Sequence, residues 1–130
     1  MLILGSEVKV TDNSGAKRAQ CLKILGGSKK VGRIGDIIVV AIKEIKSRGL
    51  SKSRITKGIP KGSVQKGVIL RTRKEYRRKD GTRLRFGENA IALLKKQGGS
   101  PISTRLFGPI LEDLRLVKDM RLLSLALNIV

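Results

Sequence analysis

Hydrophobic and polar positions alternate with a period of two in several stretches of the chain, which is the spacing of half-buried β-strands. Residues 6–12 and 82–86 alternate in this way, whereas residues 36–45 and 90–95 are nearly continuous apolar runs. Apolar runs rich in β-branched residues are typical of strands that are covered on both faces. The pattern predicts strands near residues 6–12, 19–26, 36–45, 64–72, 82–86 and 90–95.

The predicted strands are short and separated by turn residues, which favours a small closed or nearly closed β-barrel over a β-α-β fold. Asp12-Asn13-Ser14-Gly15 forms one turn. Asp80-Gly81 is typical of a hairpin, because glycine accepts a positive φ without steric cost. The side chains expected to line the core are Val8, Val10, Leu22, Ile24, Ile38, Val40, Val68, Leu70, Ile91 and Leu93.

Two strands carry finer expectations about which face is buried. In the second strand, Leu22 and Ile24 should share one face, with Cys21 and Leu25 on the other. Cys21 lies inside an apolar strand, so we expect a small buried residue rather than a reactive thiol. The β-branched run at 36–45 should be covered on both faces.

The last thirty residues have a different pattern from the predicted barrel. Gly108-Pro109 is predicted to open a helix, because proline suits the first helical turn. Leu111, Leu114 and Val117 recur at a spacing of three and would form one apolar stripe. Residues 120–127 fit a second short helix or a final strand. We expect one domain, residues 1–130, with a barrel over about 1–100 and a helical part over about 101–130.

Charge separates the middle of the chain from its ends. The sequence has 29 Lys and Arg against 10 Asp and Glu, a net charge of +19, and this favours a polyanionic partner. Residues 43–85 contain 16 of the cations and three acids, whereas residues 86–130 contain six cations and four acids. We therefore expect nucleic acid to bind mainly to the middle third.

Lys46 to Ser63 form a long basic stretch without an acid and with few apolar side chains, which cannot support an independent fold. We expect this stretch to become ordered against RNA. The cations predicted to contact RNA, in this stretch and beside it, are Lys17, Arg18, Lys29, Lys30, Arg48, Lys52, Arg54, Lys57, Lys61, Arg71, Arg73, Lys74, Arg77, Arg78 and Lys79.

The few aromatic residues indicate how RNA would be bound. Proteins that read single strands stack bases on several exposed aromatic rings. Here Phe86 and Phe107 lie in apolar contexts and are expected in the core. Tyr76 lies among cations and could stack on a base or lie over arginine side chains. The sequence thus predicts phosphate and sugar contacts to structured RNA rather than base reading.

The residues of the common catalytic and metal sites are scarce. The chain has no His and one Cys, which argues against Ser-His and Cys-His nucleophiles and the usual metal sites. Residues 27–32 have the glycine spacing of a phosphate-binding loop, but Arg33 and Ile34 stand where Lys and Ser or Thr are required. We expect no enzyme activity, no cofactor and no bound metal; a nuclease or RNA-modifying enzyme is the rival class.

A membrane role has little support in the sequence. No run of about 18 apolar residues is present, and the cations lie in predicted strands and loops rather than on an amphipathic helix. We therefore expect no membrane partner. The apolar start, residues 1–5, is too short for a signal peptide, so no cleavable targeting segment is expected in this sequence: either none is needed or it is already missing from this chain.

Several motifs together resemble one family. They are Gly67-Val68-Ile69-Leu70, Asp80-Gly81, Phe86, Asn89-Ala90, Asp12-Asn13-Ser14-Gly15-Ala16 and Thr104-Arg105-Leu106-Phe107-Gly108-Pro109. In their order along the chain these motifs are similar to the signature of the universal large-subunit ribosomal protein fourteen, over nearly the whole chain. The resemblance implies a mainly β fold: a small five-stranded β-barrel with a projecting basic ribbon and one or two short C-terminal helices.

The same resemblance implies a function and a set of partners. It implies a structural component of the large ribosomal subunit that binds large-subunit rRNA and contributes to an intersubunit bridge with small-subunit rRNA. Implied protein partners are the neighbouring large-subunit proteins three and nineteen, and a ribosome-silencing factor. From the residues alone, a structured-RNA-binding protein outside the ribosome remains the alternative.

A low net charge in the C-terminal part favours protein and bridge contacts there. By resemblance, Thr104, Arg105 and Arg121 match positions at which the family meets the silencing factor. Arg115 and Lys118 are expected on the outer side of the predicted helix, where an Arg can bind a carboxylate or a phosphate. The alternative for Arg105 is that it caps a carbonyl inside the fold.

Two departures from the bacterial pattern bear on localisation. The basic stretch between Ile45 and Gly67 is longer by several residues, and the end at Leu125-Ala126-Leu127 lacks the proline that bacterial members place after Leu-Ala. By resemblance, these departures favour an organellar ribosome, in the mitochondrial matrix. A bacterial cytoplasm or a plastid stroma is the alternative.

Overall fold

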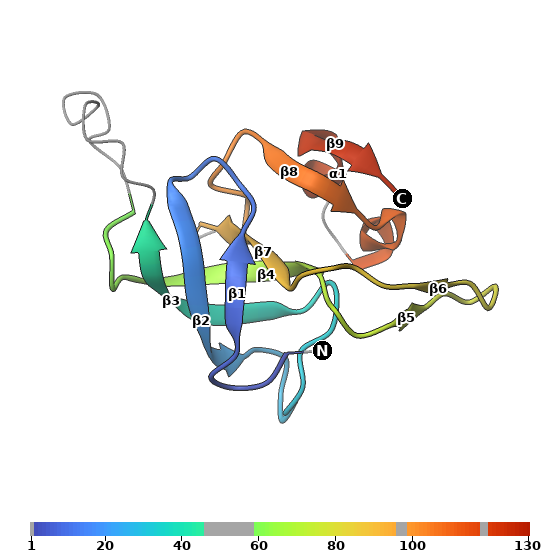
Figure 1. Cartoon of the computed structure of the whole chain (residues 1–130), viewed down its shortest axis with the longest axis horizontal. Coiled ribbons are helices and arrows are strands. Elements are labelled where there is room, and N and C mark those ends of the chain that lie inside the picture. Colours follow the sequence, from blue (N-terminus) through green and yellow to red (C-terminus); the bar gives the residue numbers. More distant parts are fainter. Residues whose placement is uncertain (1, 46–58, 96–98, 118–119) are drawn as a thin grey trace.

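Five strands close into a barrel in the computed structural model, which describes residues 2–45, 59–95, 99–117 and 120–130 (Figure 1). β1 and β7 pair in parallel, and every other neighbouring pair is antiparallel. This confirms the predicted mainly β fold with a small five-stranded barrel. In barrel order the strands are β1 (Glu7–Val10), β2 (Ala16–Ile24), β3 (Ile37–Ile45), β4 (Val64–Arg71) and β7 (Ala90–Leu94).

The strand predicted near residues 82–86 is not part of the barrel, so that prediction is wrong. β5 (Tyr76–Arg77) and β6 (Arg83–Leu84) form a separate two-stranded hairpin that projects from the barrel (Figure 1). Arg83 and Arg85 are exposed and Leu84 is only half-buried. A segment with so little apolar surface gains little from entering a barrel wall, where one face must be desolvated.

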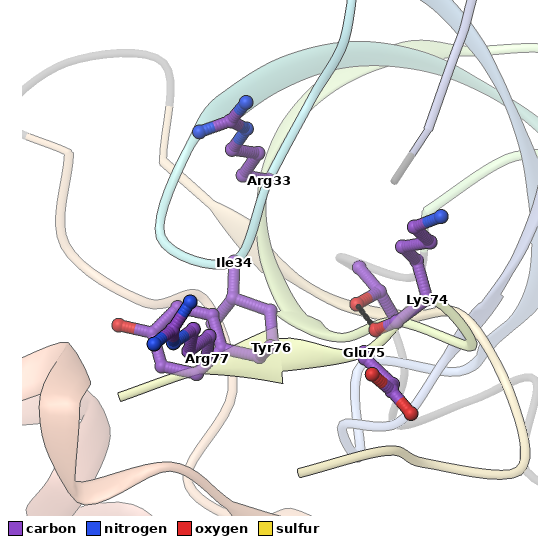
Figure 2. A pocket seen from close by; sticks show the side chains of 7 residues that line it. Arg33, Ile34, Lys74, Glu75, Tyr76 and Arg77 are labelled. Carbon is purple, nitrogen blue, oxygen red and sulfur yellow. Dashed lines mark hydrogen bonds between the residues drawn. The ribbon is translucent and has the colours of Figure 1, made fainter. Parts of the chain in front are cut away.

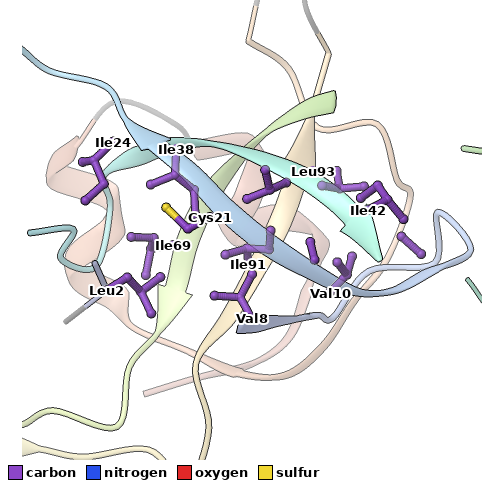
Figure 3. Close-up of a cluster of buried hydrophobic side chains, with 13 residues drawn as sticks. Leu2, Val8, Val10, Cys21, Ile24, Ile38, Ile42, Ile69, Ile91 and Leu93 are labelled. Carbon is purple, nitrogen blue, oxygen red and sulfur yellow. The ribbon is translucent and has the colours of Figure 1, made fainter. Parts of the chain in front are cut away.

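The barrel interior is filled by side chains from all five strands and by Leu2 from the N-terminal segment (Figure 3). Val8, Val10, Ile24, Ile38 and Val40 are buried there, as predicted, together with Ile91 and Leu93. Leu2 enters because its N–H and carbonyl pair with the backbone of Gly32 at 2.8 and 2.7 Å. Alternation of inward and outward side chains therefore holds in most of the barrel.

β2 departs from simple alternation, and the predicted facing of its side chains is wrong. Cys21 and Ile24 point inward and are 1% and 3% exposed, whereas Leu22 is 46% exposed. The pairing of β2 with β3 shifts register between Cys21 and Lys23, and such a bulge moves the following residue to the other face. The expectation that Cys21 is a small buried residue is confirmed, and burial raises the pKa of its thiol.

The outer face of β3 is less covered than its apolar sequence predicts. Ile38, Val40 and Ile42 are fully buried on the inner face, but Ile37 and Ile45 are 39% and 40% exposed. The prediction that both faces are covered is therefore wrong for β3. No second layer covers this strand among the described elements, because the C-terminal part lies on the other side of the barrel (Figure 1).

β4 and β7 are the strands that are buried on both faces. Ile69 and Ile91 point into the barrel, while Val68, Leu70 and Ala92 point outward into a second apolar cluster. Val68 and Leu70 are thus buried as predicted, but outside the barrel interior. The other members of the second cluster are Leu94, Leu106, Ile110, Leu114, Leu122 and Leu123.

The C-terminal part is a mixture of strands and short helices. It contains β8 (Leu106–Ile110), the 3-10 helix η1 (Glu112–Val117), α1 (Met120–Leu125) and β9 (Ala126–Ile129), and β8 and β9 pair in parallel. The helix predicted to open at Pro109 is wrong, because Pro109 lies in β8. Residues 120–127 form a helix that passes directly into a strand. Among the described residues, no helix is long and apolar enough to span a membrane.

The bulge in β2 gives a direct test of the fold. Ile24→Ala should lower the free energy of unfolding by about 2–5 kcal/mol, because it leaves a cavity in the barrel. Leu22→Ala, two positions earlier, should change it by less than about 0.5 kcal/mol because that side chain is largely solvated. Urea denaturation of both variants measures this, and equal losses would contradict the observed facing.

Candidate nucleic-acid interface

The basic ribbon, residues 73–85, is the most cationic part of the structure that projects from the barrel (Figure 1). Its tip is a turn in which the Asp80 carboxylate accepts the Thr82 N–H at 2.9 Å and Gly81 has φ of +92°. The hydrogen bonds from Thr82 lower the pKa of Asp80. The turn predicted at Asp80-Gly81 is confirmed, and it presents the arms of the ribbon to solvent.

Six of the predicted RNA contacts are exposed cations with no carboxylate within 4 Å among the described residues. Four of them lie on the ribbon, and the other two lie in loops next to the barrel. Arg73 also donates from Nε to the Gly87 carbonyl at 3.1 Å. These residues are Lys30, Lys61, Arg73, Lys74, Arg77 and Lys79.

Three predicted contacts on the barrel are exposed but already paired with acids. Lys17 Nζ lies 3.2 Å from Glu44, and Arg18 Nε donates to the same carboxylate at 2.7 Å. Hydrogen bonds from these two cations lower the pKa of Glu44. Lys29 Nζ lies 2.9 Å from Asp36. Their charge is partly compensated within the protein, so they offer less to a phosphate than the ribbon cations do.

Four further predicted contacts lie in the long basic stretch. Most of the stretch from Lys46 to Ser63 lies outside the described residues. This part includes all four predicted contacts, Arg48, Lys52, Arg54 and Lys57. The part that is described begins at Ile59, which packs against the barrel core, and leads into β4.

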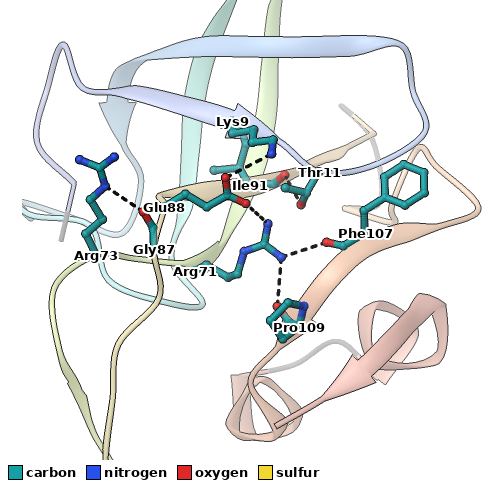
Figure 4. Close-up of polar contacts among 9 residues, drawn as sticks. All are labelled: Lys9, Thr11, Arg71, Arg73, Gly87, Glu88, Ile91, Phe107 and Pro109. Atoms are coloured by element: carbon teal, nitrogen blue, oxygen red, sulfur yellow. Dashed lines mark hydrogen bonds and ion pairs between the residues drawn. The ribbon is translucent and has the colours of Figure 1, made fainter.

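Arg71 is an internal residue, and the prediction that it contacts RNA is corrected here. Its side chain is only 5% exposed. Nη1 donates to the carbonyls of Phe107 and Pro109 at 2.9 and 3.2 Å, and Nη2 donates to Glu88 at 2.6 Å (Figure 4). A guanidinium with three acceptors inside the protein is not available to a phosphate.

Glu88 completes this arrangement, which we call the Arg71 cluster: Arg71, Glu88, Lys9 and the carbonyls of Phe107 and Pro109. Lys9 Nζ lies 3.2 Å from the other oxygen of Glu88 (Figure 4). Partial burial opposes ionisation of Glu88, but the hydrogen bonds and charges of Lys9 and Arg71 outweigh it and lower the pKa of this carboxyl. The cluster joins β1 and β4 of the barrel to β8.

Gly108 leaves the space that the guanidinium occupies. A Cβ built at this position would lie 2.2 Å from Arg71 Nη1, and the backbone φ is +79°. Both observations require glycine between the two carbonyls that Arg71 binds. Gly108 was predicted to mark a helix start, but its role is this close approach.

Arg78 and Tyr76 anchor the ribbon to the C-terminal part. Arg78 Nε lies 3.5 Å from Asp113 in η1, an ion pair without hydrogen-bond geometry, and Nη2 donates to the Val130 carbonyl. Burial, and then the charge and hydrogen bond of Asp113, raise the pKa of the Tyr76 hydroxyl. Arg78 therefore makes contacts within the protein, and its place among the RNA contacts stays a prediction.

A pocket of about 330 Å³ lies where the ribbon leaves the barrel (Figure 2). One wall comes from the loop before β3, through Arg33 and Ile34, and the other from Lys74, Tyr76 and Arg77. Arg33 was not among the predicted contacts, although it lies in the same basic loop as Lys29 and Lys30. Only the tertiary structure brings it beside Lys74 and Arg77.

The residues predicted for protein and bridge contacts are spread over the C-terminal part. Thr104 and Arg105 are exposed just before β8, and Arg121 is exposed in α1. Arg105 makes no hydrogen bond or ion pair with any described residue, so nothing there supports the alternative of an internal cap. Arg115 lies in η1, and Lys118 falls outside the described residues.

Thr104 also has a role inside the fold. Its N–H donates to the Asn13 side-chain oxygen at 3.1 Å, and Asn13 Nδ2 donates to its hydroxyl at 2.9 Å. The neighbouring Asp12 is fully buried and accepts the Leu93 N–H at 2.9 Å and the Ser14 N–H at 3.1 Å. The turn of residues 12–15 therefore positions the segment that presents Thr104 and Arg105.

Apolar side chains are exposed on the two strands of the C-terminal part. Phe107 is 40% exposed, which makes the prediction of a core position for it wrong, whereas Phe86 is half-buried. Leu127 and Ile129 in β9 are 70% and 48% exposed. Exposed apolar side chains on paired strands are typical of a protein contact surface.

The comparison with known protein families agrees with the architecture. The family described as ribosomal protein L14p/L23e matches residues 1–130, the whole chain. The chain belongs to this L14p/L23e family. It is therefore a structural protein of the large ribosomal subunit, with a role in translation, and its family is not one of enzymes.

Membership in the L14p/L23e family places the chain in the ribosome, with rRNA and ribosomal proteins around it. Within the described ranges, no group of three or more His, Cys, Asp or Glu side chains is arranged to hold a metal ion. In this L14p/L23e protein the candidate interface is thus a set of cations and exposed apolar side chains on a rigid scaffold.

The internal role of Arg71 can be tested by substitution. Arg71→Ala should lower the free energy of unfolding of this L14p/L23e protein by about 2–3 kcal/mol, because two carbonyls and Glu88 lose their donor. Arg77→Ala, an exposed arginine with no recorded internal partner, should change it by less than about 0.5 kcal/mol. Thermal and urea unfolding of both variants measure this difference, and equal stability would refute the internal role.

Proposed function

We propose that this chain binds large-subunit rRNA directly, mainly through phosphate and sugar contacts along the basic ribbon and the adjoining loops. The main support for the proposal is that exposed cations without a nearby carboxylate lie on the projecting ribbon. Lys74, Arg77 and Lys79 are exposed on the projecting ribbon with no carboxylate within 4 Å among the described residues, whereas Lys17 on the barrel and Lys29 in the loop before β3 are paired with acids. Uncompensated charge on a projecting element binds a polyanion strongly.

The scarcity of exposed aromatic side chains supports this mode of binding. The chain has one Tyr and two Phe, and Tyr76 and Phe86 are half-buried. Recognition that depends on several stacked bases needs more exposed rings. Phosphate contacts fix a protein on folded RNA without reading its sequence, which suits a structural component of the subunit.

The salt dependence of RNA binding tests this proposal. A triple variant, Lys74→Ala, Arg77→Ala and Lys79→Ala, should bind a large-subunit rRNA fragment more weakly and with a flatter dependence on salt. Each lost phosphate contact reduces the slope of log K against log salt by about 0.9. The slope is measured by filter binding or fluorescence anisotropy at salt concentrations of about 50 to 300 mM.

A matched control removes the same charge from the barrel. The triple variant Lys17→Ala, Arg18→Ala and Lys29→Ala also loses three cations, but each of them faces an acid in the structure. Its salt slope should change less than that of the ribbon variant. Equal slopes for both variants would show that the ribbon has no special place in RNA binding.

We further propose that the C-terminal part contacts small-subunit rRNA across an intersubunit bridge, and proteins. The proposed protein partners are large-subunit proteins three and nineteen and, where present, a ribosome-silencing factor. Support comes from Arg105 and Arg121, which are exposed, and from the exposed apolar side chains of Leu127 and Ile129 in β9. The low net charge of residues 86–130, six cations against four acids, makes bulk rRNA anchoring less favourable here.

Arg105→Glu tests the proposed bridge and protein contacts. The variant should fold normally and enter the large subunit, since Arg105 is exposed and has no internal partner among the described residues. Subunit joining or silencing-factor binding should be impaired. The guanidinium that would bind a phosphate or carboxylate of the partner is replaced by a negative carboxylate, which repels these groups. Sucrose-gradient profiles separate the two steps. A folded variant that fails to enter the large subunit would identify Arg105 as an rRNA anchor instead.

We propose the mitochondrial matrix as the location of this ribosome, with a bacterial cytoplasm or a plastid stroma as the alternative. The support is the lengthened basic stretch between Ile45 and Gly67, and the absence of a proline after Leu125-Ala126. Co-sedimentation of the protein with ribosomes from each isolated compartment, after a high-salt wash, distinguishes these locations.

A further inference from the structure

The loop that forms one wall of the pocket at the base of the ribbon is held in place by contacts within the protein. The loop that contributes Arg33 and Ile34 is held on both sides, since Gly32 pairs with Leu2 and the Gly35 N–H donates to the Ile69 carbonyl at 2.8 Å. Ile34 itself packs against both apolar clusters. One wall of the pocket is therefore part of the core rather than a free loop.

The opposite wall is fixed by polar contacts of the ribbon. Tyr76 is half-buried and pairs with Leu84 across the ribbon, and the nearby Arg78 lies 3.5 Å from Asp113 in η1. The Thr72 hydroxyl donates to the Lys74 carbonyl at 3.0 Å and holds the turn that leads into the ribbon. The Tyr76 ring thus keeps its place without a ligand, and a preformed aromatic wall lowers the entropic cost of binding.

The rim of the pocket is cationic, and its charge is not compensated within the protein. Arg33, Lys74 and Arg77 are exposed, and none of them has a carboxylate within 4 Å among the described residues. The one acid at the rim, Glu75, is paired with Arg83 at 3.7 Å. Apolar walls with an aliphatic and an aromatic side chain, surrounded by three unpaired cations, match a flat base joined to phosphates.

We infer that this pocket binds one unpaired nucleoside of the RNA, with its base against Ile34 and Tyr76 and its flanking phosphates at Arg33, Lys74 and Arg77. The inference rests on the proposed function, because the ribbon must lie along RNA for a base to reach the pocket. A phosphate or an acidic side chain alone would need the cations but not the apolar walls. In this pocket the chain contacts a base as well as the backbone of the RNA.

Two RNA duplexes of equal length test the inference, one fully paired and one with a single bulged 2-aminopurine nucleotide. The full-length protein should bind the bulged duplex about tenfold more tightly, which corresponds to about 1.4 kcal/mol. Binding should also quench the fluorescence of the bulged base as it stacks on Tyr76. Tyr76→Leu should abolish both the preference and the quenching, whereas Tyr76→Phe, which keeps the ring, should retain most of each.

The rim is tested separately, in case Tyr76→Leu disturbs the ribbon. Arg33→Ala should weaken binding of the bulged duplex about three- to fivefold more than binding of the paired duplex, on the order of the net contribution of one typical hydrogen bond. Lys30→Ala removes the same charge from the same loop outside the pocket lining, and should weaken both duplexes equally.

The outcomes separate this inference from the proposed function. Salt-dependent binding of both duplexes with equal affinity and no quenching would overturn the pocket and leave rRNA binding by the ribbon intact. Absence of salt-dependent binding to either duplex would overturn both. A preference that survives in Tyr76→Leu and Arg33→Ala would place the base elsewhere and would also overturn the inference.

Discussion

The whole structure depends on β4 and β7 being apolar on both faces. A strand in a small barrel needs only one apolar face, and β1 meets that requirement with Val8 and Val10 inside and charged residues outside. Ile69 and Ile91 face the barrel, while Val68 and Ala92 would face water if nothing covered them. The hydrophobic effect therefore requires a second layer on this side of the barrel, and the C-terminal part supplies it.

The Arg71 cluster determines how that second layer sits. Arg71 follows the apolar run of β4 directly, and its guanidinium donates to two carbonyls of β8, those of Phe107 and Pro109. Buried carbonyls and a buried charge are costly unless they are paired, so this contact has few alternatives. Gly108 is required because any side chain there would occupy the place of the guanidinium.

The small number of acids has a functional consequence. Three acids take part in ion pairs that hold the fold together. Glu88 pairs with Arg71 next to the C-terminal part, and Asp113 pairs with Arg78 of the ribbon. Glu44 pairs with Lys17 on the barrel surface. Among the described residues, several of the cations that have no carboxylate within 4 Å lie on the ribbon and at its base, including Arg33, Lys74, Arg77 and Lys79. The ion pair of Arg78 with Asp113 joins this cationic ribbon to the C-terminal part, next to the Tyr76 wall of the pocket.

The sequence by itself determined the strands, the turn at Asp80-Gly81, the barrel and the basic middle of the chain, because each of these depends on local periodicity, turn chemistry or charge counts. Its motifs also identified the family, which spans the whole chain. Only the tertiary structure decided that Leu22 is exposed, that Pro109 lies in a strand and that Arg71 is internal. It also decided that Arg78 pairs with Asp113 and that Arg33 and Arg77 line one pocket. These features depend on a bulge, on a second layer and on contacts between distant segments. A local pattern contains no information on which distant carbonyl or carboxylate a given cation will meet.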